Sequence, residues 1–245
     1  MQTRSKSGIH NPRLHPSLFL THFEPKTVEQ ALKNAYWLIG MQQEYEALLK
    51  NKTWDLIPLH PNRQGIGCKW VFRVKENVDG SINRFKARLV TRGFHQIHGF
   101  DFCKTFSPVV KPVTIRVVLT LALSHGWKLF QIDMNNAFLD GLLKEYVFMT
   151  QPLGFEVAYR SLVWKLNKAL YGLKQAPRQW FDRLKSILLQ FGFVGSKCDS
   201  SFFIYWQQMH IVYLLVYVDD IIITGSFASL IKQLTNKLHT TFSLK

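Results

Sequence analysis

The feature that most constrains this chain is a pair of adjacent acids inside a long apolar run. The run spans residues 213–224, is rich in β-branched and aromatic residues, and is interrupted by Asp219 and Asp220. This composition predicts two buried strands that meet at the acids. Unpaired carboxylates in apolar surroundings are costly, so such acids are normally paired or bound to metal. We favour a metal-binding carboxylate pair over a plain hairpin turn, because tight turns prefer Gly or Asn and the run contains neither.

The net charge of the chain indicates a polyanionic partner. Its 245 residues carry a formal charge of +15. No basic amphipathic helix of the membrane-surface kind is visible, no apolar run approaches the length of a membrane span, and the N-terminus lacks a signal-peptide core. Cys68, Cys103 and Cys198 match no zinc-binding spacing and predict reduced, intracellular thiols. We therefore expect a polyanion, and no membrane, as the partner.

A second feature is a predicted β-hairpin with one basic side. Residues 69–75 and 84–90 alternate in polarity, and Asp79 and Gly80 between them predict the turn. A period of two puts the basic residues on one side of the hairpin and the apolar residues on the other. The basic side holds Lys69, Arg73, Lys75, Arg84, Lys86 and Arg88. Charged strand faces are usually only solvated, but no acid is interleaved here, so we favour phosphate binding.

The other segments predict a mixture of helices and strands, after a flexible basic lead-in over residues 1–26. Thr27 favours a helix start, and apolar spacing continues that helix to Leu49. Residues 115–124 are apolar nearly all round and predict a buried helix, with a strand as the alternative. A strand over 127–134 carries a third acid, Asp133. The remaining predictions are a strand over 146–149, a loop over 166–177 leading into a helix that ends at Gly192, strands over 202–206 and 211–217, and a helix over 229–242.

Six motifs in a fixed order give the chain a family resemblance. They cover residues 67–72, 85–90, 105–110, 133–141, 169–177 and 217–220. Together they resemble a copia-type reverse transcriptase from the Pol polyprotein of a long-terminal-repeat retrotransposon, over residues 28–245. Residues 3–9 resemble the linker that precedes this domain in plant members, so a plant source is expected.

The resemblance implies an α+β fold with the fingers and palm subdomains of a right-hand polymerase. Its palm would be an antiparallel sheet backed by helices. Residues 1–26 would be a flexible basic linker, and residues 27–245 would form the fingers and palm. The family continues past this point into a primer grip, a thumb and a ribonuclease H domain, so we expect a truncated domain.

The resemblance also implies a catalytic centre. Asp133, Asp219 and Asp220 match the catalytic acids and, with the main-chain carbonyl of Met134, the metal ligands. They would hold two Mg²⁺ ions, for which Mn²⁺ can substitute. Mg²⁺ prefers carboxylate oxygens, and two such ions support in-line phosphoryl transfer.

Further residues match the family's nucleotide pocket. Phe138 matches an aromatic gate that excludes the ribose 2′-OH, with core packing as the alternative. Tyr171, Gly172 and Lys174 match the loop that lines the pocket. The candidates for binding the triphosphate are Lys69, Arg73, Lys86 and Arg88.

The activity implied by the resemblance is RNA-directed DNA synthesis. The partners would be an RNA template, a DNA primer, deoxynucleoside triphosphates and the rest of the Pol polyprotein, in cytoplasmic virus-like particles. No targeting signal is visible. The alternative is a catalytically weak or inactive remnant that only binds nucleic acid. A metal-dependent nuclease would explain the acids and the basic charge, but neither Phe138 nor the order of the motifs.

Overall fold

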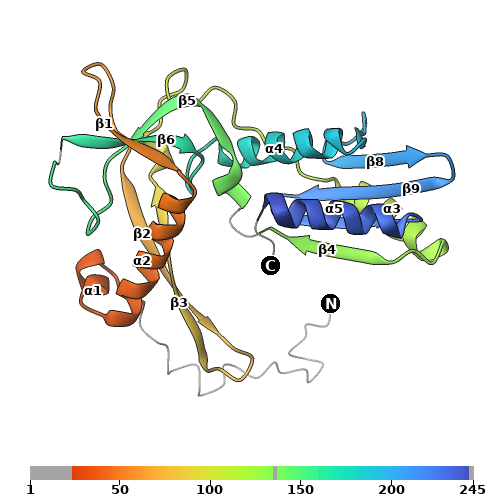
Figure 1. The fold of residues 1–245 in the computed structure, drawn as a ribbon, viewed down its shortest axis with the longest axis horizontal. Coiled ribbons are helices and arrows are strands. Elements are labelled where there is room, and N and C mark those ends of the chain that lie inside the picture. Colours follow the sequence, from red (N-terminus) through yellow and green to blue (C-terminus); the bar gives the residue numbers. More distant parts are fainter. Residues whose placement is uncertain (1–23, 135–136, 160, 243–245) are drawn as a thin grey trace, which may run out of the picture.

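Antiparallel sheets and flanking helices make up this protein, which is described by a computed structural model over residues 24–134, 137–159 and 161–242. The named strands form sheets of two, three and five strands, and every pairing between them is antiparallel. The two smaller sheets lie at one end of the longest axis and the five-stranded sheet at the other (Figure 1). The predicted α+β class is therefore confirmed. Most of the predicted linker over 1–26 lies outside the described residues.

The first helical region consists of two helices where one was expected. Helix α1 (Val28–Leu32) begins at Thr27, whose side chain accepts a hydrogen bond from the Gln30 amide, as predicted. Helix α2 (Ala35–Lys50) begins at Asn34, which has an extended backbone and caps the helix with its side chain. Because Asn34 offers its side chain to the following amides, a new helix starts there.

The predicted basic hairpin is present as strands β2 (Cys68–Glu76) and β3 (Ile82–Thr91). The turn residue Gly80 has a φ of +83°, and Asp79 accepts hydrogen bonds from Ser81. Trp70 and Phe72 lie buried on the apolar side, and Trp37 of α2 packs edge-on against Phe72 at 5.3 Å between ring centroids. Helix α2 therefore covers the apolar side of the hairpin.

The three-stranded sheet contains the largest departure from the sequence predictions. Its order is β1 (Trp54–Pro58), β6 (Leu162–Lys168) and β5 (Leu142–Met149). Strand β1 was not predicted. The first part of the predicted loop over 166–177 belongs to strand β6. The predicted strand over 146–149 is present as the end of the longer strand β5. Trp54 and Trp164 stack at 3.5 Å between ring centroids. Pairing between strands so distant in sequence leaves little local signal.

The five-stranded sheet carries the acids. Its order is β4 (Leu129–Asp133), β10 (Asp220–Gly225), β9 (His210–Tyr217), β8 (Phe202–Gln207) and β7 (Val194–Gly195). Helices α4 (Ala176–Gln190) and α5 (Ala228–Thr241) pack with the sheet in one apolar core. That core includes Ile221 and Ile223 of β10, Leu184 of α4 and Leu234 of α5. Pro177 lies in the first turn of α4, as predicted.

Helix α3 (Pro112–Ser124) has the predicted helical structure, but the expectation that it is buried was wrong. Only Val118 and Ala122 of this helix are buried, whereas Val117 is 53% and Leu123 85% exposed. The helix contacts the sheet through one side, where Val118 clusters with Leu215 of β9. A one-sided contact cannot bury a helix that is apolar nearly all round.

Candidate active site

The adjacent acids lie at the turn between β9 and β10. Asp220 is the first residue of β10 and pairs with Tyr217 across the hairpin, so Val218 and Asp219 are the two central turn residues. Asp220 also pairs with Asp133 at the end of β4. Directly paired residues share one face of a sheet. The fold therefore brings together the third acid and the acid pair, as the resemblance implied.

A main-chain hydrogen bond joins the turn to β4. The Met134 amide donates to the carbonyl of Asp219 over 3.0 Å. The Met134 side chain is 1% exposed and belongs to the core beneath the sheet. Met134 therefore fixes the position of Asp219 relative to Asp133, while its proposed role as a carbonyl ligand remains a prediction.

Tyr171 contacts both the basic hairpin and Phe138. Its ring meets Phe138 edge-on at 5.4 Å between centroids, and the Arg88 guanidinium lies over it at 4.6 Å. Burial raises the pKa of the Tyr171 hydroxyl, the Arg88 charge opposes this rise, and the charges of Glu44, Asp219 and Asp133 add to it. Tyr171 therefore joins Arg88 of the hairpin to Phe138.

The basic side of the β2–β3 hairpin forms a cavity of about 630 Å³, which we call the basic cavity. Strand register places Arg73 opposite Lys86. The charged residues that line the cavity are Arg73, Lys75, Arg84, Lys86, Arg88 and Glu24. Lys69 pairs with Val90 and is not among the residues that line the basic cavity. The structure thus brings together three of the four predicted triphosphate-binding residues and places the fourth outside the basic cavity.

Two acids missed by the sequence predictions accompany this basic side. Glu24 forms an ion pair with Arg73 at 3.8 Å. Glu44 of α2 accepts a hydrogen bond from the Leu89 amide. Burial raises the pKa of Glu44, and the charges of Arg88 and Lys86 act in the opposite direction. Both acids come from outside the hairpin, so the alternation within its strands could not reveal them.

Residues 171–175 form the predicted pocket loop. Gly172 has a φ of +92°, and a Cβ on it would come within 2.2 Å of the Thr91 carbonyl oxygen. Only glycine fits this crossing. The Thr91 amide donates to the carbonyl of Tyr171 over 2.8 Å, which attaches the loop to β3. The Lys174 ammonium lies over the Phe102 ring at 4.7 Å, so Lys174 contacts the segment after β3.

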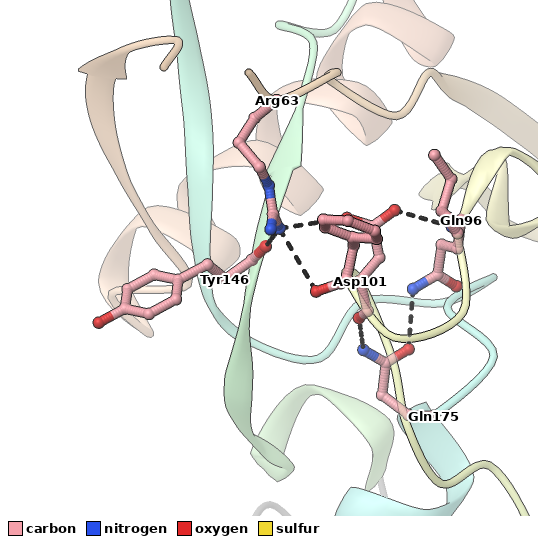
Figure 2. Close-up of polar contacts among 7 residues, drawn as sticks. Arg63, Gln96, Asp101, Tyr146 and Gln175 are labelled. Carbon is pink, nitrogen blue, oxygen red and sulfur yellow. Dashed lines mark hydrogen bonds and ion pairs between the residues drawn. The ribbon is translucent and has the colours of Figure 1, made fainter. Parts of the chain in front are cut away.

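A polar network behind this loop was also missed. Figure 2 shows the Gln175 side chain donating to the carbonyl of Asp101 and accepting from Gln96. Gln175 is fully buried, and Arg63 forms an ion pair with Asp101 at 3.4 Å. The network holds the pocket loop against residues 96–101. The motif contains Gln175, but nothing in its sequence identifies that side chain as buried.

The acids provide the oxygen donors that Mg²⁺ prefers, although they do not converge in a preformed site. Over residues 24–134, 137–159 and 161–242, no three His, Cys, Asp or Glu side chains lie close enough together to hold a metal ion. Asp220 accepts a hydrogen bond from the Gln131 side chain over 3.1 Å. The donor chemistry and the pairing of Asp133 with Asp220 therefore fit a magnesium site, whereas the two-ion arrangement remains a prediction.

The part of the chain described by the structure contains no helix long and apolar enough to cross a membrane.

The sequence defines the class to which this fold and site belong. A family model described as reverse transcriptase (RNA-dependent DNA polymerase) matches residues 51–245. The chain belongs to this family.

Its relatives include proteins of plant transposons, which confirms the predicted plant copia-type affinity. The chain is 48% identical over 250 residues to the retrovirus-related Pol polyprotein from transposon RE1 of Arabidopsis thaliana, covering 100% of this chain and 17% of that protein. It is 41% identical over 227 residues to the corresponding polyprotein from transposon TNT 1-94 of Nicotiana tabacum, covering 91% of this chain and 17% of the relative. The chain thus spans about a sixth of the length of these relatives.

Two solved structures are also similar. One is a foamy viral protease-reverse transcriptase in complex with double-stranded DNA, with a TM-score of 0.40 and 14% identity over 85% of this chain and 30% of that chain. The other is an apo telomerase from Candida tropicalis, with a TM-score of 0.39 and 10% identity over 85% of this chain and 53% of that chain.

Proposed function

We propose that this chain catalyses RNA-directed DNA synthesis, in which a deoxynucleotide is transferred to the 3′-OH of a primer. The observation that supports this most strongly is the pairing of Asp133 at the end of β4 with Asp220 of β10, next to Asp219 in the turn. A triphosphate needs cations along its phosphates and acids that can hold metal at its reactive end. The basic cavity offers the cations, and the paired acids offer the metal ligands.

In this proposal each region has a separate role. Asp133, Asp219 and Asp220 would hold the metal, with the carbonyl of Met134 as a further ligand. When bound, two Mg²⁺ ions would activate the attacking oxygen and stabilise the leaving pyrophosphate. The chain's own acids keep these charges at the end of β4 and at the β9–β10 turn, where Tyr217 and Asp219 are exposed.

The basic cavity would bind the incoming triphosphate. Arg73, Lys86 and Arg88 line it and supply charge-assisted hydrogen bonds to phosphate oxygens. Lys69 would act only through its general positive charge, because it lies outside the cavity. The β2–β3 hairpin then corresponds to the fingers and the five-stranded sheet to the palm, as the family resemblance implies.

Phe138 would exclude ribonucleotides. It is half-buried, packs against both apolar cores and contacts Tyr171 of the pocket loop. Gly172 would let the main chain of the pocket loop approach the base, and Lys174 would support the loop from behind. The remaining positive charge would follow the RNA template and DNA primer without reading sequence. By family resemblance, we place the reaction within a Pol polyprotein in cytoplasmic virus-like particles.

Primer extension tests the proposed function. A labelled DNA primer annealed to RNA should be extended with Mg²⁺ and all four deoxynucleotides, and EDTA should stop the reaction. Asp133→Asn should abolish extension, whereas Asp182→Asn, at a half-buried acid paired with Arg178 on α4, should leave it unchanged. Extension that survives Asp133→Asn would contradict the assigned site. Binding of the primer–template without any extension by the wild type would support the alternative, a weak or inactive nucleic-acid-binding remnant.

A further inference from the structure

The turn that carries Asp219 has an unfavourable backbone conformation. Val218 has a φ of +57°, whereas Asp219 is not among the residues with positive φ. Positive φ at only the first central residue is the pattern of a type II′ turn, in which that residue is usually Gly. For a β-branched residue this conformation is rare, and it costs about 1–3 kcal/mol. Surrounding contacts must therefore hold the turn in this form.

A second turn type is available to the same two residues. A type I′ turn has positive φ at both central residues, and aspartate tolerates that conformation better than most residues do. The two types differ mainly by rotation of the peptide group between the central residues. Here that group contains the Val218 carbonyl and the Asp219 amide. The direction of the Val218 carbonyl therefore decides which turn forms and how the Asp219 carboxylate is presented.

The Val218 carbonyl is held by a buried tryptophan. The indole N–H of Trp180, on α4, donates to it over 2.8 Å. Trp180 is 1% exposed and packs edge-on against Phe242 at 4.9 Å between ring centroids. Rotating the Val218 carbonyl away would leave a buried indole N–H without this partner, at a cost of about 1–3 kcal/mol. That cost is comparable to the strain at Val218.

The peptide group on the other side of Asp219 is held as well. Its carbonyl oxygen accepts the hydrogen bond from the Met134 amide of the β4 side. Asp219 therefore lies between two anchored peptide groups, one bonded to α4 and one to the segment that carries Asp133. Because α4 directly follows the pocket loop, the helix that holds the turn also supports that loop.

We propose that Trp180 is a positioning residue that keeps Asp219 in the geometry required for nucleotide transfer. The effect of Trp180 on catalysis rests on the proposed function, whereas its effect on the conformation of the turn does not. Without the indole N–H, the turn would populate the second form, and Asp219 would spend part of its time misdirected. A displacement of about 1 Å at a reacting group can cost on the order of 100-fold in rate.

Trp180→Phe tests this, because phenylalanine keeps most of the buried ring and removes the N–H. The matched control is Trp70→Phe. Trp70 lies on β2 and is also buried, and its indole N–H donates to the Leu153 carbonyl over 3.2 Å. Both variants lose one indole hydrogen bond and should lose similar thermal stability. NMR of the chain labelled with ¹⁵N and ¹³C reads the turn directly, through the Val218 carbonyl and the amides of Val218, Asp219 and Asp220.

Trp180→Phe should shift or split these turn signals, whereas Trp70→Phe should leave them in place. In primer extension, Trp180→Phe should lower kcat about 10- to 100-fold with little change in KM for the deoxynucleotide, whereas Trp70→Phe should change kcat by less than about twofold. Unchanged turn signals in Trp180→Phe would overturn the inference, whatever the activity. Moved signals with wild-type kcat would overturn the catalytic role. If the wild type itself did not extend a primer, the proposed function would fail, and the NMR spectra would still decide whether Trp180 holds the turn.

Discussion

The β2–β3 and β9–β10 hairpins carry opposite charges and place them differently. The β2–β3 hairpin carries its basic residues on the strands, and its turn at Asp79 and Gly80 has conventional geometry. The β9–β10 hairpin carries its acid in the turn itself, beside a valine with positive φ. The β2–β3 turn only connects strands and obeys local turn chemistry. Where a turn presents a reacting group, local preference is overruled by contacts from elsewhere.

The comparison separates two kinds of effect on the reaction. Changes in the acidic turn should affect the chemical step, and changes in the basic cavity should affect nucleotide binding.

The largest effect is expected at the acidic turn. Asp219→Asn should lower kcat by at least about 100-fold, because it removes charge at the point where the transition state needs metal. Asp220→Asn should lower kcat less, since Asp220 belongs to β10 and already accepts a hydrogen bond from Gln131. Single-turnover extension measures both. Equal losses, or a larger loss for Asp220→Asn, would contradict the larger role expected for Asp219.

The basic cavity should show the complementary effect. Lys86→Ala should raise KM for the deoxynucleotide about 10-fold with a smaller change in kcat, because a charge-assisted contact to phosphate is lost. Lys69→Ala removes the same charge from the same hairpin outside the cavity, so its KM should stay within about twofold of the wild type. Steady-state kinetics on one primer–template distinguishes them. A similar rise in both variants would mean that general positive charge, and not the cavity, binds the triphosphate.

The aromatic residue between the two hairpins should control sugar selectivity. Phe138→Ala should reduce discrimination against ribonucleotides about 10-fold or more, because the 2′-OH no longer meets a ring. Phe155→Ala is the control, since Phe155 is also half-buried but stacks on Tyr45 of α2. The ratio of kcat/KM for the deoxy- and ribonucleotide gives the answer. Unchanged discrimination in Phe138→Ala would leave this residue with a packing role only.

Exchanging the turn residues tests the difference in backbone strain. Gly80→Val should lower the free energy of unfolding by about 1–2 kcal/mol, because valine disfavours the positive φ of that open turn. Val218→Gly should change it in the opposite direction, by about 1 kcal/mol, because glycine removes that strain. Urea denaturation of both variants measures the two values. Destabilisation by both would show that Val218 is not strained.

The smallest effect is expected at Asp199, which attaches the start of α3 to the segment before β8. Burial would raise the pKa of Asp199, but hydrogen bonds from Thr114 and from the amides of Lys111 and Ser201 outweigh it and lower the pKa. A lowered pKa contributes stability above the unfolded value of about 3.9, and this contribution is lost as pH falls through the folded value. Asp199→Asn should therefore cost about 1 kcal/mol at pH 7, with unchanged catalysis.

The difference between wild type and Asp199→Asn should shrink as the pH falls below about 4. Thermal melts across pH 3–7 measure it, with Asp182→Asn as the control at a half-buried acid. A difference that stayed constant with pH would mean that the Asp199 charge does not stabilise the attachment of α3.

The basic hairpin shows how far the sequence alone could be followed. Its strands, its turn and its two faces all follow from alternation and from Asp79 and Gly80, which are local signals. The acids could be identified as an expensive feature of an apolar run, but their meeting with Asp133 needed either the family resemblance or the fold.

The contacts that complete the site could not be predicted, because they join distant segments. Arg88 over Tyr171 joins β3 to the pocket loop, and the hydrogen bond from Trp180 to Val218 joins α4 to the turn. The conformation of Val218 is the opposite of what its residue type favours. Strand β1 was missed because its pairing with β6 is long-range. In each case a tertiary contact decides what local propensity cannot.

The central claim is that the acidic turn and the basic cavity act on one nucleotide. Replacing Mg²⁺ by Fe²⁺ and adding ascorbate tests it most directly, because radicals formed at the bound ion cut the nearby main chain. With a deoxynucleotide and primer–template bound, main-chain cuts are expected next to Asp133 and at Val218 and Asp219. A weaker set of cuts is expected on β3 near Arg88. Asp219→Asn should remove both sets of cuts. Cuts confined to other segments, or a pattern unchanged in Asp219→Asn, would contradict the claim.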